Sequence, residues 1–232
     1  MSQPKKKKKQ RIIRPKATFC GLVVWSALGI LLIPLVLITL LATLRLFTQV
    51  PIFSRAMLSM LMGVLIYALI HFFVYQSTVF YVLAHEFTHA IFAIFSGAQV
   101  KKIKVASRGG WVELTQSNFI IDLAPYFFPL YSILLAVLYF IANRFWDLTG
   151  YYFLFFFLLG ASLCFHYLSN WEILKIEQPD MKITGKIFGI IFVLLANLLF
   201  LNIIIMFVFL DYVNLATLVD NFRDAYRVIN IF

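Results

Sequence analysis

Residues 79–97 read VFYVLAHEFTHAIFAIFSG, an apolar stretch that carries two histidines and one acidic residue. These residues, His85, Glu86 and His89, form the pattern H-E-x-x-H. On a helix, positions four apart differ by about 40° around the axis, so both imidazoles point to one side and can bind one Zn²⁺ ion. Glu86 can then act as general base toward a water at that ion. The pattern therefore predicts a zinc site within an apolar helix.

The composition of the chain indicates the solvent around this site. Of the 232 residues, 62% are hydrophobic and 13% are charged, and the mean hydropathy is +0.92. A soluble domain carries about 25% charged residues, so most of this surface must face lipid. The net charge of +10 does not indicate nucleic-acid binding, because eight of the basic residues fall within residues 1–16. Cys20 and Cys164 lie in apolar runs and are expected to be free thiols.

Long apolar runs predict the membrane helices. A helix needs about 20 residues to cross a bilayer. The runs cover residues 17–44, 56–97, 123–143, 148–171 and 187–210, and Glu86 is the one charged residue among them. Run 56–97 is too long for one straight crossing, and its polar residues 76–78 divide it into two full spans or into one span and a partly inserted helix. We therefore predict an all-α polytopic membrane protein with about six membrane helices.

Residues 99–117 form the longest polar interruption and predict a small β-hairpin. Apolar and polar side chains alternate over residues 100–105 and 111–114, on either side of turn residues 107–110. An open sheet edge cannot lie in lipid, so the hairpin belongs at the interface or against protein.

The remaining parts of the chain give the domain organisation. Residues 211–232 carry apolar side chains at helical spacing and predict an amphipathic helix along the surface. We expect a basic cytoplasmic segment 1–16, a membrane domain 17–210 that contains the hairpin, and the amphipathic tail 211–232.

Basic residues predict the orientation, since loops rich in Lys and Arg stay in the cytoplasm. This rule assigns residues 1–16 to the cytoplasm. It assigns the hairpin, with Lys101, Lys102, Lys104 and Arg108, to the same side. Two full spans within run 56–97 would make three crossings after residues 1–16 and would put the hairpin outside instead. One effective crossing would remove the conflict, and the sequence leaves both readings open.

The chain resembles the site-2 protease class of intramembrane zinc metalloproteases, peptidase family M50, over roughly residues 79–188. The similarity rests on the H-E-x-x-H helix, the small residues 96–98, the basic hairpin and a following span that opens at Asp122 with the letters DLAP. It is greatest with small bacterial members that lack a PDZ domain, which implies a multi-pass protein of the bacterial cytoplasmic membrane. Family members usually have Gly before the second histidine, where this chain has Thr88. That difference bears on substrate fit more than on zinc binding.

The resemblance implies an Asp as the third zinc ligand, from a later membrane segment where the family has Asp-Gly. This chain has no Asp-Gly, and the candidates are Asp122, His166, Glu172, Glu177 and Asp180. We favour Asp180, which lies 91 residues (180 − 89) after His89 and just before the last span. Pro179 can fix the start of that helix and aim the carboxylate inward. A cap of the helix N-terminus is the alternative role for Asp180.

The expected activity is hydrolysis of peptide bonds in a membrane-embedded protein substrate, with Zn²⁺ on His85, His89 and Asp180 and with Glu86 moving the proton. Strand 111–114 or its partner strand is expected to hold an unwound substrate segment by strand addition. His71 is interpreted as a helix-packing residue rather than a metal ligand. Other polar residues of the spans are interpreted as helix-packing groups or as supports of the metal ligands, namely His166, Asn170, Asn197 and Asn202. The alternative functions are an inactive pseudoprotease that binds membrane helices and a metal carrier. The expected partners are therefore the lipid bilayer and a membrane protein.

Overall fold

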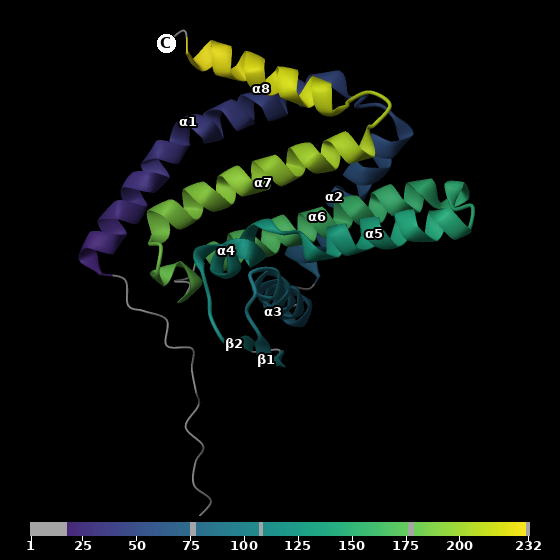
Figure 1. Cartoon of the computed structure of the whole chain (residues 1–232). Coiled ribbons are helices and arrows are strands. Elements are labelled where there is room, and N and C mark those ends of the chain that lie inside the picture. Colours follow the sequence, from purple (N-terminus) through teal and green to yellow (C-terminus); the bar gives the residue numbers. More distant parts are fainter. Residues whose placement is uncertain (1–17, 75–77, 107–108, 176–178, 231–232) are drawn as a thin grey trace, which may run out of the picture.

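The computed structural model describes residues 18–74, 78–106, 109–175 and 179–230, which contain eight α-helices and one two-stranded antiparallel sheet (Figure 1). The helices are α1 (Phe19–Gln49), α2 (Arg55–Phe73), α3 (Thr78–Phe95), α4 (Phe119–Phe127), α5 (Leu130–Phe145), α6 (Tyr152–Leu174), α7 (Lys186–Val208) and α8 (Leu215–Ile229). The strands are β1 (Val100–Lys104) and β2 (Trp111–Leu114), and two 3₁₀ turns are η1 (Thr149–Tyr151) and η2 (Pro179–Lys182). The predicted helical fold with a small hairpin is confirmed. The basic segment 1–16, the turn residues 107–108 and the ligand candidate Glu177 lie outside the described residues.

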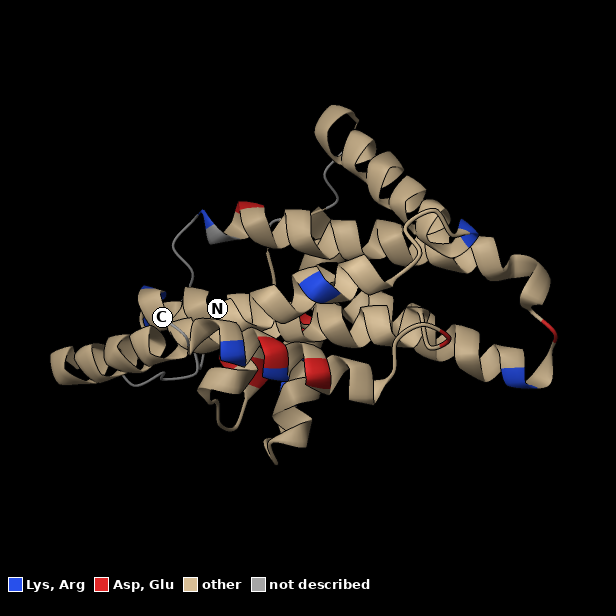
Figure 2. Ribbon diagram, turned by 90° about the horizontal axis from the view of Figure 1, so that it is seen from above, with Lys and Arg blue, Asp and Glu red and all other residues tan. Residues whose placement is uncertain are grey.

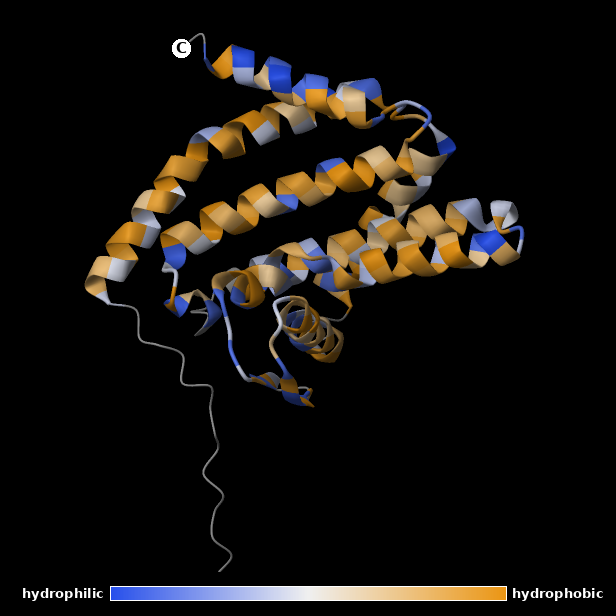
Figure 3. Ribbon diagram, viewed as in Figure 1, coloured by the Kyte–Doolittle hydropathy of each residue, from blue (hydrophilic) through white to orange (hydrophobic). Residues whose placement is uncertain are grey.

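The long helices are apolar enough to cross a membrane. Five pass on length and composition, namely α1, α2, α3, α6 together with η1, and α7. Helices α4 and α5 meet at 73° and add a sixth span if the bent pair counts as one. Figure 3 shows the helices largely in the colours of hydrophobic residues, and Figure 2 shows charged residues gathered on α8 and near helix ends. The chain is a multi-pass membrane protein with five to six candidate spans.

Helices α1 and α7 run parallel to each other. Gly29 in α1 packs against the backbone of Phe188 near the start of α7. Asn202, further along α7, donates a hydrogen bond to Thr43 of α1 at 2.6 Å. The later contact along α1 is also the later contact along α7, so the two helices point the same way. The starts of α1 and α7 therefore lie at the same end of the bundle.

Helices α2 and α6 are also parallel to each other. Ser59 near the start of α2 donates to the carbonyl oxygen of Phe153 near the start of α6 at 2.6 Å. His71 near the end of α2 lies 3.2 Å from the carboxylate of Glu172 near the end of α6. His71 therefore acts as a helix-packing residue, which was its predicted role.

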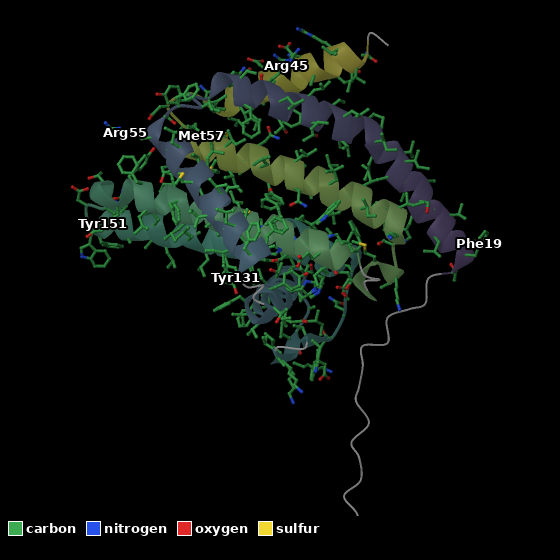
Figure 4. All side chains as sticks on the ribbon, turned by 180° about the vertical axis from the view of Figure 1, so that it is seen from behind. Phe19, Arg45, Arg55, Met57, Tyr131 and Tyr151 are labelled. Atoms are coloured by element: carbon green, nitrogen blue, oxygen red, sulfur yellow. The ribbon has the colours of Figure 1, made fainter. Side chains whose placement is uncertain are left out.

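The connections between these helices define two ends of the bundle. One connection joins α1 to α2 and another joins α6 to α7, so the starts of α1 and α7 lie together with the ends of α2 and α6. We call this the Phe19 end, and the opposite end the Tyr151 end (Figure 4). The start of α4 belongs to the Phe19 end, where the Phe119 ring lies 5.5 Å from that of Trp25 in α1.

The span formed by α4 and α5 is broken at Pro129. Proline has no N–H and disfavours a helical residue before it, and Phe128 is accordingly extended (φ −98°, ψ 105°). The carbonyl oxygen of Tyr126 accepts hydrogen bonds from Asn170 of α6 (3.1 Å) and Asn197 of α7 (3.0 Å) instead of from the next helical turn. Two polar side chains from neighbouring spans thus satisfy backbone that the break exposes in an apolar region.

Helix α3 runs across the bundle. In Figure 1 its ribbon is seen nearly end-on, while α5, α6 and α7 lie across the view. The helix ends at Gly97 (φ 76°), where Ala98 N donates to the Ala93 carbonyl at 2.8 Å. The hairpin then folds back on α3, and Leu114 and Ile121 pack with these two alanines in one apolar cluster. As expected, the hairpin is packed against protein.

The C-terminal helix α8 lies against the end of α1. Gln49 and Asn221 exchange two side-chain hydrogen bonds of 3.0 and 2.8 Å, and Arg45 forms an ion pair with Asp224 at 2.9 Å. The tail therefore forms a helix with one face on the bundle and one charged face, which Figure 2 shows.

Candidate metal centre

Three side chains from two elements converge beside the broken span. His85 and His89 lie one turn apart on α3, and Asp180 lies in η2 between α6 and α7. Nε2 of His85 is 3.1 Å from Nε2 of His89 and 3.3 Å from Oδ2 of Asp180. Nε2 of His89 is 3.7 Å from the same oxygen. Among the described residues, this group of histidine and acidic side chains could hold a metal ion.

These three distances fit one tetrahedral ion. Zinc lies about 2.0–2.1 Å from histidine nitrogen and about 2.0–2.2 Å from carboxylate oxygen, so ligand atoms around it stand about 3.3 Å apart. The observed separations of 3.1, 3.3 and 3.7 Å are close to that value. Three protein ligands leave the fourth tetrahedral position open for water or substrate, which is the arrangement of catalytic zinc sites.

Each imidazole is oriented through its second nitrogen. Nδ1 of His89 lies 2.8 Å from the carbonyl oxygen of Ile121, so this nitrogen donates its N–H and Nε2 is the atom left to bind a metal. Nδ1 of His85 lies 3.0 Å from the hydroxyl of Tyr81, one helical turn earlier. Metal-binding histidines are usually held in this way, because the partner fixes the tautomer and the direction of the ring.

Tyr126 connects Asp180 to the broken span. Its hydroxyl donates to Oδ2 of Asp180 at 2.9 Å, and its backbone carbonyl accepts from Asn170 and Asn197. Its ring meets that of His85 edge-on, with 5.4 Å between the centroids. Tyr126 is fully buried beside the break in the span. Its position there fixes the hydroxyl that orients the carboxylate of Asp180.

The charge state of Asp180 suits a cation site. Burial raises the pKa of this carboxyl, but hydrogen bonds and charge from His85 and His89 outweigh burial and hold the pKa well below its usual value. The side chain is therefore an ionised carboxylate at neutral pH, which is the form that binds metal ions.

Glu86 lies against Gly110, the residue just before β2. The residue is buried, and a Cβ added to Gly110 would lie 2.7 Å from the Cγ of Glu86. The same Cβ would lie 2.7 Å from the Lys104 carbonyl oxygen and from Val82. Since these contacts surround Gly110, a larger residue there would have to displace either the strand or Glu86. The hairpin thus covers the predicted general base.

The other described candidates for the third ligand lie outside this group. Asp122, in the first turn of α4, accepts a hydrogen bond from Ser117 at 2.7 Å. Glu172 pairs with His71 at 3.2 Å, and His166 lies on α6 within reach of an asparagine of its own helix. The structure therefore brings Asp180, and not these residues, to the histidine pair.

The local structure around Asp180 differs from the expectation in one respect. Asp180 lies in a separate 3₁₀ turn, whereas the last span begins only at Lys186. Gly185 (φ 77°) occupies the cap position of that span, so Asp180 is not its cap. The chain between α6 and α7, rather than the start of the span, carries the carboxylate to the metal group.

Sequence reasoning missed Tyr81 and Tyr126. Tyr81 stands four residues before His85, a spacing that puts both side chains on one helix face and could have indicated their contact. Tyr126 had no comparable signal, because its partner Asp180 is 54 positions away and tyrosine is common in this chain.

Comparison with protein-family models, with curated proteins and with solved structures finds no match to this chain. The interpretation of the metal centre therefore rests on the geometry and chemistry of its residues.

Proposed function

We propose that the protein is an intramembrane zinc metalloprotease of the site-2 protease class. The observation that carries this proposal is the set of three ligand atoms 3.1–3.7 Å apart, with a glutamate next to the first histidine on the same apolar helix. Such a donor set suits zinc, because two imidazoles and one carboxylate with an open position are typical of zinc peptidases. The resemblance in the H-E-x-x-H pattern and the following hairpin supports the same class.

The residues of the site have separate roles in this proposal. His85, His89 and Asp180 hold the ion, while Tyr81 and Tyr126 fix the direction of two of these ligands. A bound zinc ion supplies Lewis acidity, which activates water and polarises a peptide carbonyl. Glu86 takes the proton from the attacking water and returns it to the leaving amine when the peptide bond breaks.

The hairpin is the proposed support for substrate. A transmembrane helix must lose its internal hydrogen bonds before it can be cut, and an edge strand offers replacement partners. The sheet has two strands, so each has one edge that is not paired within it, and β2 begins next to Gly110, which touches Glu86. Proline at Val112 should slow cleavage of a membrane substrate at least tenfold; unchanged cleavage after proline substitutions along both strands would remove this role.

The distribution of lysine supports a cytoplasmic Phe19 end. The described residues place five arginines at the Tyr151 end or on α8, namely Arg45, Arg55, Arg144, Arg223 and Arg227. They place six lysines in the hairpin, after α6 and up to the start of α7, namely Lys101, Lys102, Lys104, Lys175, Lys182 and Lys186. The sequence just before α1 adds eight basic residues. The positive-inside rule then favours five crossings, by α1, α2, the α4–α5 pair, α6 and α7, with α3 partly inserted from the cytoplasmic side and the hairpin on that side. This arrangement removes the conflict over the hairpin.

Cysteine labelling tests the orientation. In a variant without the two native cysteines, Asp220→Cys on α8 should react with an impermeant maleimide added outside intact cells, and Lys182→Cys should react only after lysis. The reverse pattern would invert the proposed orientation.

The two alternative functions are separated by metal content and turnover. A carrier needs ligand groups along a path, but His71 is paired with Glu172, and the described residues contain one metal-binding group. An inactive helix-binding protein would retain zinc and cleave nothing.

Glu86→Gln tests the proposed chemistry. The amide cannot accept a proton, and both imidazoles keep their helix positions, so zinc should stay bound while cleavage of a single-span peptide in vesicles falls at least 100-fold. The matched control is Asp220→Asn, an exposed acid on α8, which should cleave at the wild-type rate. Full turnover by Glu86→Gln would exclude Glu86 as the base.

A further inference from the structure

A small pocket adjoins the metal centre on the His85 side. It lies between α3, the break in the α4–α5 span and α6, and its walls include His85, Thr88, Phe128, Phe165 and His166. The pocket is partly enclosed and has room for little more than one water molecule. It therefore adjoins the proposed reaction centre without being part of the ligand set.

The polar atoms around this pocket are already engaged by other protein groups. The Thr88 hydroxyl donates to the Ala84 carbonyl at 2.7 Å, and the Tyr131 hydroxyl donates to the Phe80 carbonyl at 2.8 Å. The hydroxyl of Ser162, a third wall residue, lies 3.0 Å from a carbonyl oxygen of its own helix and 2.8 Å from another serine. A ligand in the pocket would find apolar surface together with polar groups that already have protein partners.

We infer that this pocket is the subsite for one substrate side chain next to the cleaved bond, and that Thr88 limits it to a hydrogen or a methyl group. This inference rests on the proposed function. Thr88 is 1% exposed, and its hydroxyl is turned back to its own helix, so the residue occupies space without offering a hydrogen bond to a ligand. The substrate class is then a membrane segment with glycine or alanine at that position.

The size limit follows from the packing around Thr88. Because α3 holds both Thr88 and His85, the wall cannot move away from the metal centre without moving a ligand. On the facing side, the break at Pro129 is held through the Tyr126 carbonyl by two asparagines. A side chain larger than alanine would have to displace one of these fixed walls, and a misfit of a single methylene changes binding roughly 10-fold or more.

Two variants change the pocket by different amounts. Thr88→Ser removes one methyl group and keeps the hydroxyl that bonds to Ala84, whereas Thr88→Gly removes the whole side chain. Thr39→Ser is the matched control, because Thr39 in α1 is also buried and donates its hydroxyl four residues back at 2.7 Å, far from the pocket.

The test measures binding and cleavage separately in the zinc-loaded full chain. Amino-acid hydroxamates of glycine, alanine, valine, leucine and phenylalanine serve as binding probes for the Glu86→Gln protein, read by thermal shift. Single-span peptides in vesicles that differ only in that residue serve as cleavage probes for protein with Glu86 intact. We expect leucine to bind and to be cleaved about 10-fold less well than alanine. Thr88→Ser should extend the tolerance to valine, Thr88→Gly should extend it to leucine, and Thr39→Ser should keep the original order.

Each outcome decides between the two proposals. Cleavage without any dependence on side-chain size, or the same order in Thr88→Gly as in the native sequence, would overturn the subsite and leave the protease proposal standing. A size order in hydroxamate binding without cleavage would support the subsite and overturn the protease proposal.

Discussion

The seam between α2 and α6 and the break between α4 and α5 hold spans together in different ways. The seam has one hydrogen bond and one His–Glu contact near its two ends and two glycines between them. At the seam, Gly63 packs on the backbone of Phe157 and Gly160 packs on the backbone of Met60, so that an added Cβ would overlap a carbonyl oxygen at either position. At the break, polar side chains donate to exposed backbone. Small residues let two helix backbones approach closely. The interrupted span instead needs polar side chains to satisfy its backbone, and it places the Tyr126 hydroxyl against the carboxylate of Asp180.

The largest expected effect comes from filling the seam. Gly63→Leu should lower the free energy of unfolding by about 3 kcal/mol or more, because the side chain meets backbone that cannot rotate away. The melting temperature should then fall by roughly 10 °C.

The matched control for the seam is Gly150→Ala in η1, where an added Cβ has no neighbour within 4 Å. It should melt like the unmodified protein. If Gly63→Leu and Gly150→Ala melt at the same temperature, α2 and α6 are packed less closely at Gly63 than the structure shows.

The next effect concerns the third ligand. Asp180→Ala should lower zinc affinity about 100-fold or more while the protein stays folded, since two imidazoles form an incomplete shell. Asp122→Ala should keep zinc near the original stoichiometry, because Asp122 accepts from Ser117 and lies outside the group. Metal analysis after dialysis measures both. Loss of zinc from Asp122→Ala alone would reverse the assignment, and loss from neither would redirect it to His166 or Glu172.

A smaller effect links the break to the metal. Tyr126→Phe removes the hydroxyl that donates to Asp180, so zinc affinity should fall about 10-fold. The control is Tyr131→Phe, whose hydroxyl donates to the Phe80 carbonyl and should leave zinc affinity unchanged. Equal affinities in the two variants would mean that Tyr126 does not orient the ligand.

The smallest effect is the loss of one donor at the break. Asn197→Ala removes one of the two hydrogen bonds to the Tyr126 carbonyl and should cost about 0.6 kcal/mol of stability, the usual size for a polar contact between membrane helices. Asn170→Ala together with Asn197→Ala should cost more than the sum of the single variants, because the carbonyl then has no side-chain donor. Additive losses in thermal unfolding would argue against a shared role.

Local patterns predicted much of the fold. Apolar runs predicted the long helices, and the alternation in residues 99–117 predicted the hairpin. The direction of α3 across the bundle could not be predicted, because it depends on packing between elements and not on the residues of α3 itself. The same holds for the 73° bend, since proline breaks a helix without fixing the new direction.

In the candidate site, too, the sequence predicted the local features and missed the contacts between distant elements. The spacing of His85 and His89 is a property of one helix, so the sequence predicted their shared face. Asp180 was favoured through its position before the last span, yet it reaches the histidines from a 3₁₀ turn that the sequence did not predict. Tyr126 and the asparagines act through contacts 44 to 71 positions apart, and such contacts leave no local pattern.

The most direct test of the account is the zinc content of the purified full chain, measured together with zinc-edge X-ray absorption. The account predicts one zinc per chain with two imidazole nitrogens and carboxylate oxygen as protein ligands, and loss of that zinc in His85→Ala, His89→Ala and Asp180→Ala. A native chain that binds no zinc after exposure to the metal, or one that keeps full zinc when His85 and His89 are both replaced by alanine, would contradict it.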